Sequence, residues 1–198
     1  MILVTLSGCE KSPSILGMLS DISRTDESSD WWFILFGILF VDVVIILATR
    51  HFPKIFGSNL NIWYDNFGLS AVLADVLIIA IGFLIARTVY TKFFAAYLGW
   101  SPLHFVGLLV AVQAIHDILF YVLVIRPFPR GLNEMMDVFQ DYSKGGAKII
   151  AGDAGLMIGS AIVAMWLKTL SPEAFAAFAI STAYVLPYSL FTDYKFKA

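Results

Sequence analysis

Five long apolar stretches constrain the fold of this chain more than any other feature of its sequence. They lie at residues 31–49, 69–86, 103–125, 149–167 and 174–191. Each is close to the ~20 residues that a helix needs to cross the hydrocarbon core of a bilayer. The fifth stretch is the most polar, and Pro187 should kink its helix or end it early. The sequence therefore predicts an all-α polytopic transmembrane helical bundle with four or five spans.

Composition supports an integral, multi-pass membrane protein with the lipid bilayer as its main partner. Of the 198 residues, 59% are hydrophobic and 14% are charged, whereas soluble domains have about 45–50% and 25%. The net charge is −2 and the basic residues are scattered, so we expect no nucleic acid partner. One cysteine, Cys9, excludes an internal disulfide framework and a zinc site built from thiolates of this chain alone.

Flanking segments divide the chain into three parts. Residues 1–30 form an extramembrane segment, in which apolar residues after Ser12-Pro13 suggest a short surface helix and the run RTDESSD at 24–30 suggests a flexible acidic linker. Residues 31–192 form the bundle, and residues 193–198 form a short tail. Asp30, Ser101 and Ser171 precede three of the spans and are expected to be N-caps.

The connection between the third and fourth spans contains a short amphipathic helix. In GLNEMMDVFQDYSKGG, at 131–146, the apolar residues Leu132, Met135, Met136 and Phe139 recur at helical spacing. This pattern fits a helix that lies in the membrane interface or against a partner. A simple packed connector is an equally open interpretation.

Basic residues are unequally divided between the two sides of a five-span bundle. The side with the first loop, the third loop and the C-terminus carries more Lys and Arg than the other side. Because positive loops are usually cytoplasmic, we expect the N-terminus outside and the C-terminus inside, provided that the fifth stretch crosses.

Each of the first four spans contains one aspartate. At 1.5 Å per residue, all four lie roughly 6–12 Å from the same side of the bundle. Gln113, His116 and Asp117 have i, i+3 and i+4 spacing and therefore share one helix face. Ionisable groups inside spans normally face the bundle interior. The predicted intramembrane polar layer comprises Asp42, Asp75, Gln113, His116, Asp117, Asp153, Tyr184 and Tyr188.

Three hypotheses account for this layer. It could fix helix register, with the aspartates paired by His116, tyrosines, Gln113 and Arg50 or Arg126 at the inner interface. It could form a path for protons or cations. Enzyme or metal chemistry at His116 is the third, but the chain lacks paired-histidine, Walker and GxSxG motifs. We therefore expect no catalytic, cofactor-binding or metal-binding residues.

Small residues in the fourth span predict close helix packing. Gly155 and Gly159 have GxxxG spacing, and Ala151 lies on the same face. This motif serves contacts within one chain as well as dimerisation. We expect mainly the former, and a homo-oligomer stays an open alternative.

Residues 115–160 resemble a segment of the multi-span virion membrane proteins of large icosahedral double-stranded DNA viruses. The shared features are His116-Asp117, the turn at 127–133, the helix at 136–142 and Asp153. The resemblance covers about a quarter of the chain and carries no catalytic assignment.

The resemblance implies a structural protein of the virion inner membrane that links the bilayer to capsid-associated or other membrane proteins. The competing prediction is a small proton or cation channel or transporter that uses the aspartates. Under the first prediction the contact residues would be Arg126, Arg130, Met135, Met136 and Phe139.

Overall fold

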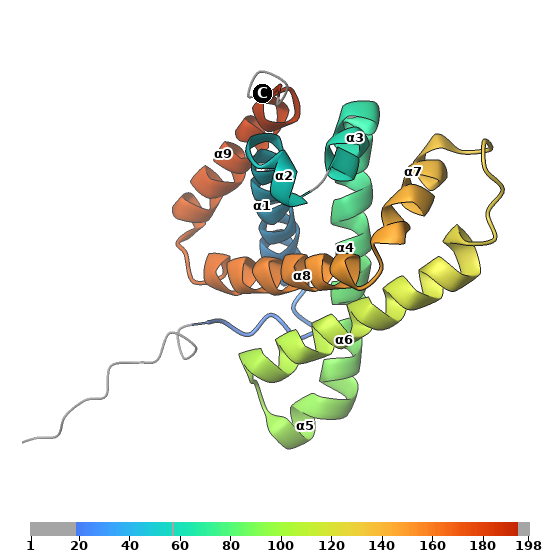
Figure 1. Cartoon of the computed structure of the whole chain (residues 1–198). Helices are drawn as coiled ribbons and strands as arrows, with labels where there is room; N and C mark the ends of the chain where they lie inside the picture. The colour runs from blue at the N-terminus through green and yellow to red at the C-terminus, as the bar shows by residue number, and fades with distance from the viewer. Residues whose placement is uncertain (1–18, 57, 194–198) are drawn as a thin grey trace, which may run out of the picture.

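The computed structural model describes residues 19–56 and 58–193, and every regular element in these ranges is helical. Figure 1 shows their arrangement, with the end of α9 near α2 and with α5 at the opposite end of the molecule. The α-helices are α1 (Asp30–His51), α2 (Pro53–Phe56), α3 (Ser58–Phe67), α4 (Leu69–Val89), α5 (Ala95–Leu98), α6 (Pro102–Phe120), α7 (Glu134–Tyr142), α8 (Ala147–Leu167) and α9 (Pro172–Leu190). The shorter elements are two π-helices, η2 (Tyr90–Phe94) and η3 (Tyr121–Ile125), and one 3₁₀ turn, η4 (Ser143–Gly145).

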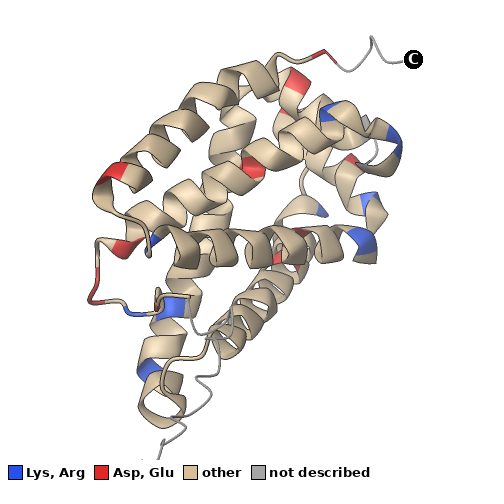
Figure 2. Cartoon of the chain, turned by 90° about the vertical axis from the view of Figure 1, so that its left-hand side faces the viewer, with Lys and Arg blue, Asp and Glu red and all other residues tan. Residues whose placement is uncertain are grey.

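Four helices are long and apolar enough to cross a membrane. They are α1, the continuous helix Leu69–Leu98, the continuous helix Pro102–Ile125, and α8. Lys and Arg residues lie toward the two ends of the molecule, and the long stretches of helix between them are uncharged except for single acidic positions (Figure 2). These observations confirm the predicted all-α, multi-pass membrane bundle.

The fifth predicted stretch forms α9, which lies alongside α1 in the same direction. The rings of Phe33 and Phe175 are 4.9 Å apart near the start of both helices. Near their ends, Arg50 Nη2 donates to the Leu190 carbonyl at 2.9 Å. The helix passes through Pro187 and ends at Leu190, so α9 covers nearly the whole length of α1.

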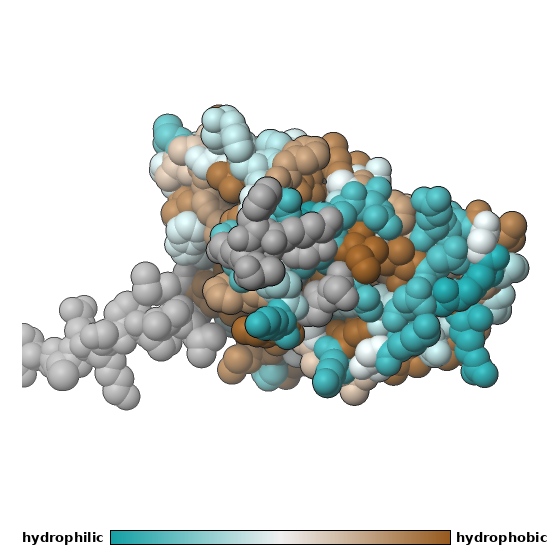
Figure 3. Space-filling view, turned by 45° about the horizontal axis from the view of Figure 1, so that its top comes forward, coloured by the Kyte–Doolittle hydropathy of each residue, from teal (hydrophilic) through white to brown (hydrophobic). Residues whose placement is uncertain are grey.

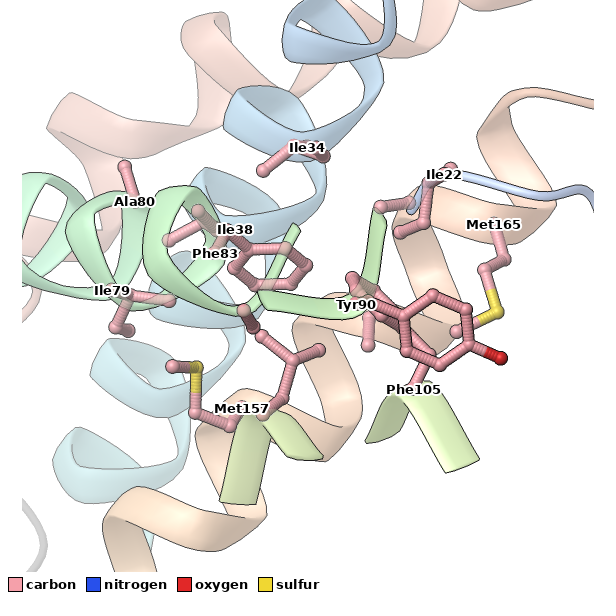
Figure 4. Packing of buried hydrophobic residues seen from close by; sticks show 14 residues of the cluster. Ile22, Ile34, Ile38, Ile79, Ala80, Phe83, Tyr90, Phe105, Met157 and Met165 are labelled. Atoms are coloured by element: carbon pink, nitrogen blue, oxygen red, sulfur yellow. The ribbon is translucent and has the colours of Figure 1, made fainter. Parts of the chain in front are cut away.

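The core gathers around α1, which contacts α8, α9, α4 and α3. The larger hydrophobic cluster joins Ile34 and Ile38 of α1 to Phe83 of α4, Phe105 of α6 and Met157 of α8 (Figure 4). In a bilayer, lipid tails are as apolar as these side chains, so close packing rather than exclusion of water holds the helices together.

Outside this core, large apolar side chains face outward along the spans. On α4 the exposed residues Leu69, Leu73, Leu77, Ile81 and Leu84 recur every three or four positions. That spacing places them on one outer face of the helix, where hydrocarbon would cover them. Figure 3 shows polar side chains gathered instead on the side of the molecule where α7 lies.

The described part of the N-terminal segment packs against the bundle, unlike the flexible linker that its composition indicates. Ile22 is fully buried in the main core. Lys168 Nζ lies 3.1 Å from Glu27 Oε2 and 2.6 Å from Asp30 Oδ1, and Arg87 donates to the Glu27 carbonyl at 2.9 Å. The acidic run is thus tied to α4 and α8. The surface helix expected near Ser12 lies mostly outside the described residues.

Two of the three expected N-caps are confirmed. The hydroxyl of Ser101 accepts from the His104 amide, and that of Ser171 accepts from the Ala174 amide. Asp30 is different, because α1 begins at Asp30 itself with Ser29 in the cap position and no side-chain cap. Its carboxylate faces Lys168 and Arg87 instead, and these cations satisfy it better than a backbone amide.

Candidate functional site

Two of the four span aspartates meet at one tyrosine hydroxyl. The hydroxyl of Tyr64, on α3, lies 2.9 Å from Asp42 Oδ1 on α1 and 3.2 Å from Asp75 Oδ2 on α4. Trp63 Nε1, also on α3, donates to the same Oδ2 of Asp75 at 3.0 Å. One short helix therefore supplies the hydrogen-bond partners for carboxyl groups on two spans.

Helix α3 is held in this place from both of its ends. At its C-terminal end Gly68, with φ of 50°, turns the chain from α3 into α4, a conformation that favours glycine. Toward the other end, Arg50 of α1 donates to Asn61 Oδ1 at 3.0 Å. The same Arg50 also pairs with Asp65, one turn further along α3, at 2.7 Å. These anchors explain why Tyr64 points at the spans rather than into the membrane interface.

The third aspartate, Asp117, has partners on its own helix for one of its two oxygens. Gln113 Nε2 donates to Asp117 Oδ1 at 2.6 Å, and His116 Nδ1 lies 3.3 Å from the same oxygen. The His116 ring also stacks on Phe120 at 5.6 Å. The predicted grouping of these three polar residues on α6 is therefore present, while Asp117 Oδ2 is buried without a hydrogen-bond partner among the described residues.

The fourth aspartate, Asp153 of α8, lies within electrostatic range of Asp117 and Asp75. It makes no hydrogen bond or ion pair within the part of the chain that the structure describes. Tyr142, at the end of α7, lies near all three carboxyl groups. Burial, followed by the negative charges of Asp153, Asp75 and Asp117, raises the pKa of the Tyr142 phenol. Asp153 thus connects the α6 aspartate to the pair at Tyr64.

Within residues 19–56 and 58–193, no Lys or Arg pairs with any of these four aspartates. Arg50, one expected partner, pairs with Asp65. Arg126, the other, is exposed on the connection after α6. The clustered carboxyl groups are Asp42, Asp75, Asp117 and Asp153, and we call them, with Tyr64, the carboxyl cluster.

Two members of the predicted layer lie elsewhere. Tyr184 and Tyr188 are exposed on the outer face of α9, where their hydroxyls hydrogen-bond to each other at 2.9 Å. Phe175 and Phe178 direct the opposite face of α9 toward α1. The depth expected for the two tyrosines does not bring them to the aspartates, because they occupy the wrong face of the helix.

The GxxxG motif accounts for only part of the helix packing. A Cβ on Gly159 would meet Val41 of α1 at 3.5 Å, whereas one on Gly155 would meet nothing within 4 Å, and Ala151 is exposed. Helices α1 and α8 approach closely at Gly37, where a Cβ would lie 3.0 Å from the Ala164 backbone nitrogen.

The expected partner-contact residues divide into two groups. Arg126 and Arg130 are exposed, and Arg130 pairs with Asp141 at 2.6 Å. Met135 and Phe139 instead pack against the cluster that contains Trp63, and Met136 is half-buried. Helix α7 is therefore packed against the bundle along its apolar face, where Met135 and Phe139 are half-buried, and a partner contact at these residues stays a prediction.

Sequence reasoning missed three members of the site: Trp63, Tyr64 and Tyr142. The first two fit the aromatic belt expected at membrane interfaces, which hides their role as hydrogen-bond donors. A usable signal was the mixed polar and aromatic face of NIWYDNF at 61–67, which is typical of a helix that packs at the surface of a bundle.

Comparison of the chain with protein-family models, with curated proteins and with solved structures gives no match. Among the described residues, no three His, Cys, Asp or Glu side chains lie close enough together to hold a metal ion.

Proposed function

We propose that this protein is a small proton channel or transporter, in which the carboxyl cluster takes up and releases protons within the membrane. The observation that carries the proposal is the single hydroxyl of Tyr64 between the carboxyl groups of Asp42 and Asp75. A hydroxyl has one proton to donate. It can satisfy both carboxyl groups only if one of them carries a proton of its own.

The absence of nearby cations in the described residues supports the same function. Ionised side chains inside spans are costly and are usually paired. Here the donors around the aspartates are the neutral groups of Tyr64, Trp63 and Gln113, together with His116. A carboxyl group without a fixed counter-ion avoids the cost of its charge by binding a proton, so the carboxyl groups of the cluster are sites that can hold an exchangeable proton.

The carboxyl cluster extends across the bundle from one helix to the next. Asp42, Asp75, Asp153 and Asp117 come from α1, α4, α8 and α6, and neighbouring carboxyl groups act on each other electrostatically. Loss of a proton from one group therefore changes the proton affinity of the next. Such a chain of coupled carboxyl groups is typical of proton relays in membrane proteins.

A flux assay tests this function. Purified protein is reconstituted in liposomes that contain a pH-sensitive dye, and a potassium gradient with valinomycin drives proton entry. We expect flux with the wild-type chain and its loss in Asp75→Asn. Asp26→Asn is the matched control, because Asp26 is exposed and its one ion pair among the described residues is with Arg24. Wild-type flux no higher than that of empty liposomes would refute the proposal. Flux of Na⁺ or K⁺ without proton flux would mean that the protein transports a metal cation and not a proton.

A structural role in a virion membrane is the second candidate. The observation that supports this role is that three residues of the resembling segment, Asp117, Tyr142 and Asp153, lie near one another. The turn at 127–133 between them is exposed, and Leu132 is 73% exposed. In this role the spans bind the bilayer, and the turn with Arg126 and Arg130 binds a capsid or membrane protein.

Crosslinking mass spectrometry on native particles or membranes tests the second candidate. Reproducible links from Lys144 or Lys148 to a coat or scaffold protein are the expected result, because both residues are exposed and Lys144 shares Asp141 with Arg130 of the turn. Links only within the chain or between its copies would count against an assembly role.

A further inference from the structure

The two carboxyl groups that share the Tyr64 hydroxyl have unequal surroundings. Asp75 Oδ2 faces two donors, the indole of Trp63 at 3.0 Å and the hydroxyl of Tyr64 at 3.2 Å. Donors of this kind stabilise a carboxylate more than a neutral carboxyl group. Asp75 is therefore the better place for the negative charge.

Asp42 has the opposite surroundings. Its residue is 3% exposed, Tyr64 is its one hydrogen-bond partner among the described residues, and its Oδ2 atom is buried with no partner. A buried charge with an unsatisfied oxygen is far more costly than a buried neutral carboxyl group in the same place.

We infer that the proton of this pair resides on Asp42, that Asp75 carries the charge, and that Tyr64 relays the proton between them. Asp42 Oδ1 then donates to the Tyr64 oxygen, and the Tyr64 hydroxyl donates to Asp75 Oδ2. In this arrangement the Tyr64 hydroxyl accepts one hydrogen bond from Asp42 and donates one to Asp75. It deepens the proposed function, because it identifies which carboxyl group holds the proton that is exchanged.

The relay step consists of two coupled proton hops, with a net transfer of one proton from Asp42 to Asp75 and no change of oxidation state. The O–H bond of Asp42 breaks as its proton passes to the Tyr64 oxygen, while the O–H bond of Tyr64 breaks and its proton passes to Asp75 Oδ2. Tyr64 is neutral before and after the step. Asp42 becomes the carboxylate, and Asp75 becomes the neutral acid.

Other ionisable groups face this pair mainly from the side of Asp75. They are Tyr142 of α7 and Asp153 of α8, with Asp117 of α6 beyond them. Loss of a proton from Asp153 places a negative charge near Asp75 and favours transfer of the shared proton toward Asp75. The wider cluster can therefore drive the relay in the direction from α1 to α4.

Infrared spectroscopy tests the assignment. The protein is labelled with ¹³C-aspartate and reconstituted in lipid, and the C=O stretching band of protonated carboxyl groups is recorded. We expect Asp42→Asn to remove one component of this band and Asp75→Asn to leave that component in place. Loss of the same component in Asp75→Asn, with retention in Asp42→Asn, would overturn the assignment.

A second variant keeps both carboxyl groups and so avoids dependence on the folding of the Asn variants. Tyr64→Phe removes only the bridging hydroxyl, and we expect the Asp42 component to shift to higher frequency as its hydrogen bond is lost. Tyr188→Phe, a change at an exposed hydroxyl, is the control and should leave the band unchanged. An unshifted band in Tyr64→Phe would refute the relay.

This experiment is separable from the flux assay. The infrared band reports where the proton resides at equilibrium and needs no transport. A protein with the Asp42 component but without flux would retain the assignment and lose the proposed function. A protein with flux and with the proton on Asp75 would retain the function and lose the assignment.

Discussion

Helices α1 and α8 approach closely at Gly37, and we predict that Gly37→Ala destabilises the fold. The added Cβ would lie 3.0 Å from the Ala164 nitrogen and 3.1 Å from the Ser160 carbonyl oxygen, below the 3.4–4 Å of ordinary contact. Both neighbours are backbone atoms, so the two helices must move apart. Overpacking of this kind costs about 1–3 kcal/mol. The gain in helix propensity from Gly to Ala offsets up to about 1 kcal/mol of that cost.

Gly155→Ala provides a matched control on the partner helix, because its Cβ would meet nothing within 4 Å. The propensity gain is common to both variants and cancels in their difference. We therefore expect Gly37→Ala to be less stable than Gly155→Ala by about 1–3 kcal/mol. Reversible unfolding in bicelles, followed by circular dichroism, measures this difference. Equal stability of the two variants would refute the close packing of α1 against α8 at Gly37.

Two further predictions concern charged groups near the ends of the spans. Lys168→Met should lower the unfolding free energy by about 3 kcal/mol, because it leaves the fully buried Asp30 without its 2.6 Å partner. Thermal unfolding measures this loss. The double variant with Asp30→Asn should recover stability, and no recovery would contradict this cause. Hydrogen bonds from Arg130 and Lys144 lower the pKa of Asp141 from 3.8 to about 2, so this pairing stabilises the fold above pH 3.8 and is lost as the pH falls through about 2. An NMR titration of Asp141 should show this low midpoint in the wild type and a higher one in Arg130→Gln, and an ordinary midpoint in the wild type would refute the pairing.

The membrane architecture follows from the sequence because hydropathy alone determines which stretches can cross a bilayer. The positions of Asp42, Asp75, Asp117 and Asp153 along their spans follow in the same way, since the rise per residue sets their depth. The position of Gln113 beside Asp117 also follows from the sequence, because the two residues are one turn apart on a single helix. These features depend only on local geometry.

Helix rotation is harder to predict in a membrane protein. A span that is apolar all round carries no signal for which face packs inward, because lipid and core are equally apolar. For this reason the GxxxG spacing predicts a packing role for Gly155, which faces outward, whereas no motif marks Gly37, where α1 and α8 approach closely. Depth along the span predicts that Tyr184 and Tyr188 lie beside the aspartates, but both are exposed on the face of α9 that points away from α1.

Partners from outside the spans are the other feature that sequence alone could not supply. Tyr64 reaches Asp42 and Asp75 only because Arg50 and Gly68 fold α3 back onto α1 and α4. Likewise, the acidic residues before α1 suggest a solvated linker until the structure shows Arg87 bonded to backbone carbonyls of that segment. Both arrangements depend on contacts between distant parts of the chain.

Proton flux through the purified chain, compared between the wild type and Asp75→Asn at equal density in liposomes, tests the central claim most directly. The proposed function predicts wild-type flux that exceeds that of empty liposomes and is lost in Asp75→Asn. Asp26→Asn should retain that flux, since Asp26 lies outside the spans. Wild-type liposomes as impermeable to protons as empty ones, or flux that Asp75→Asn leaves unchanged, would contradict the account.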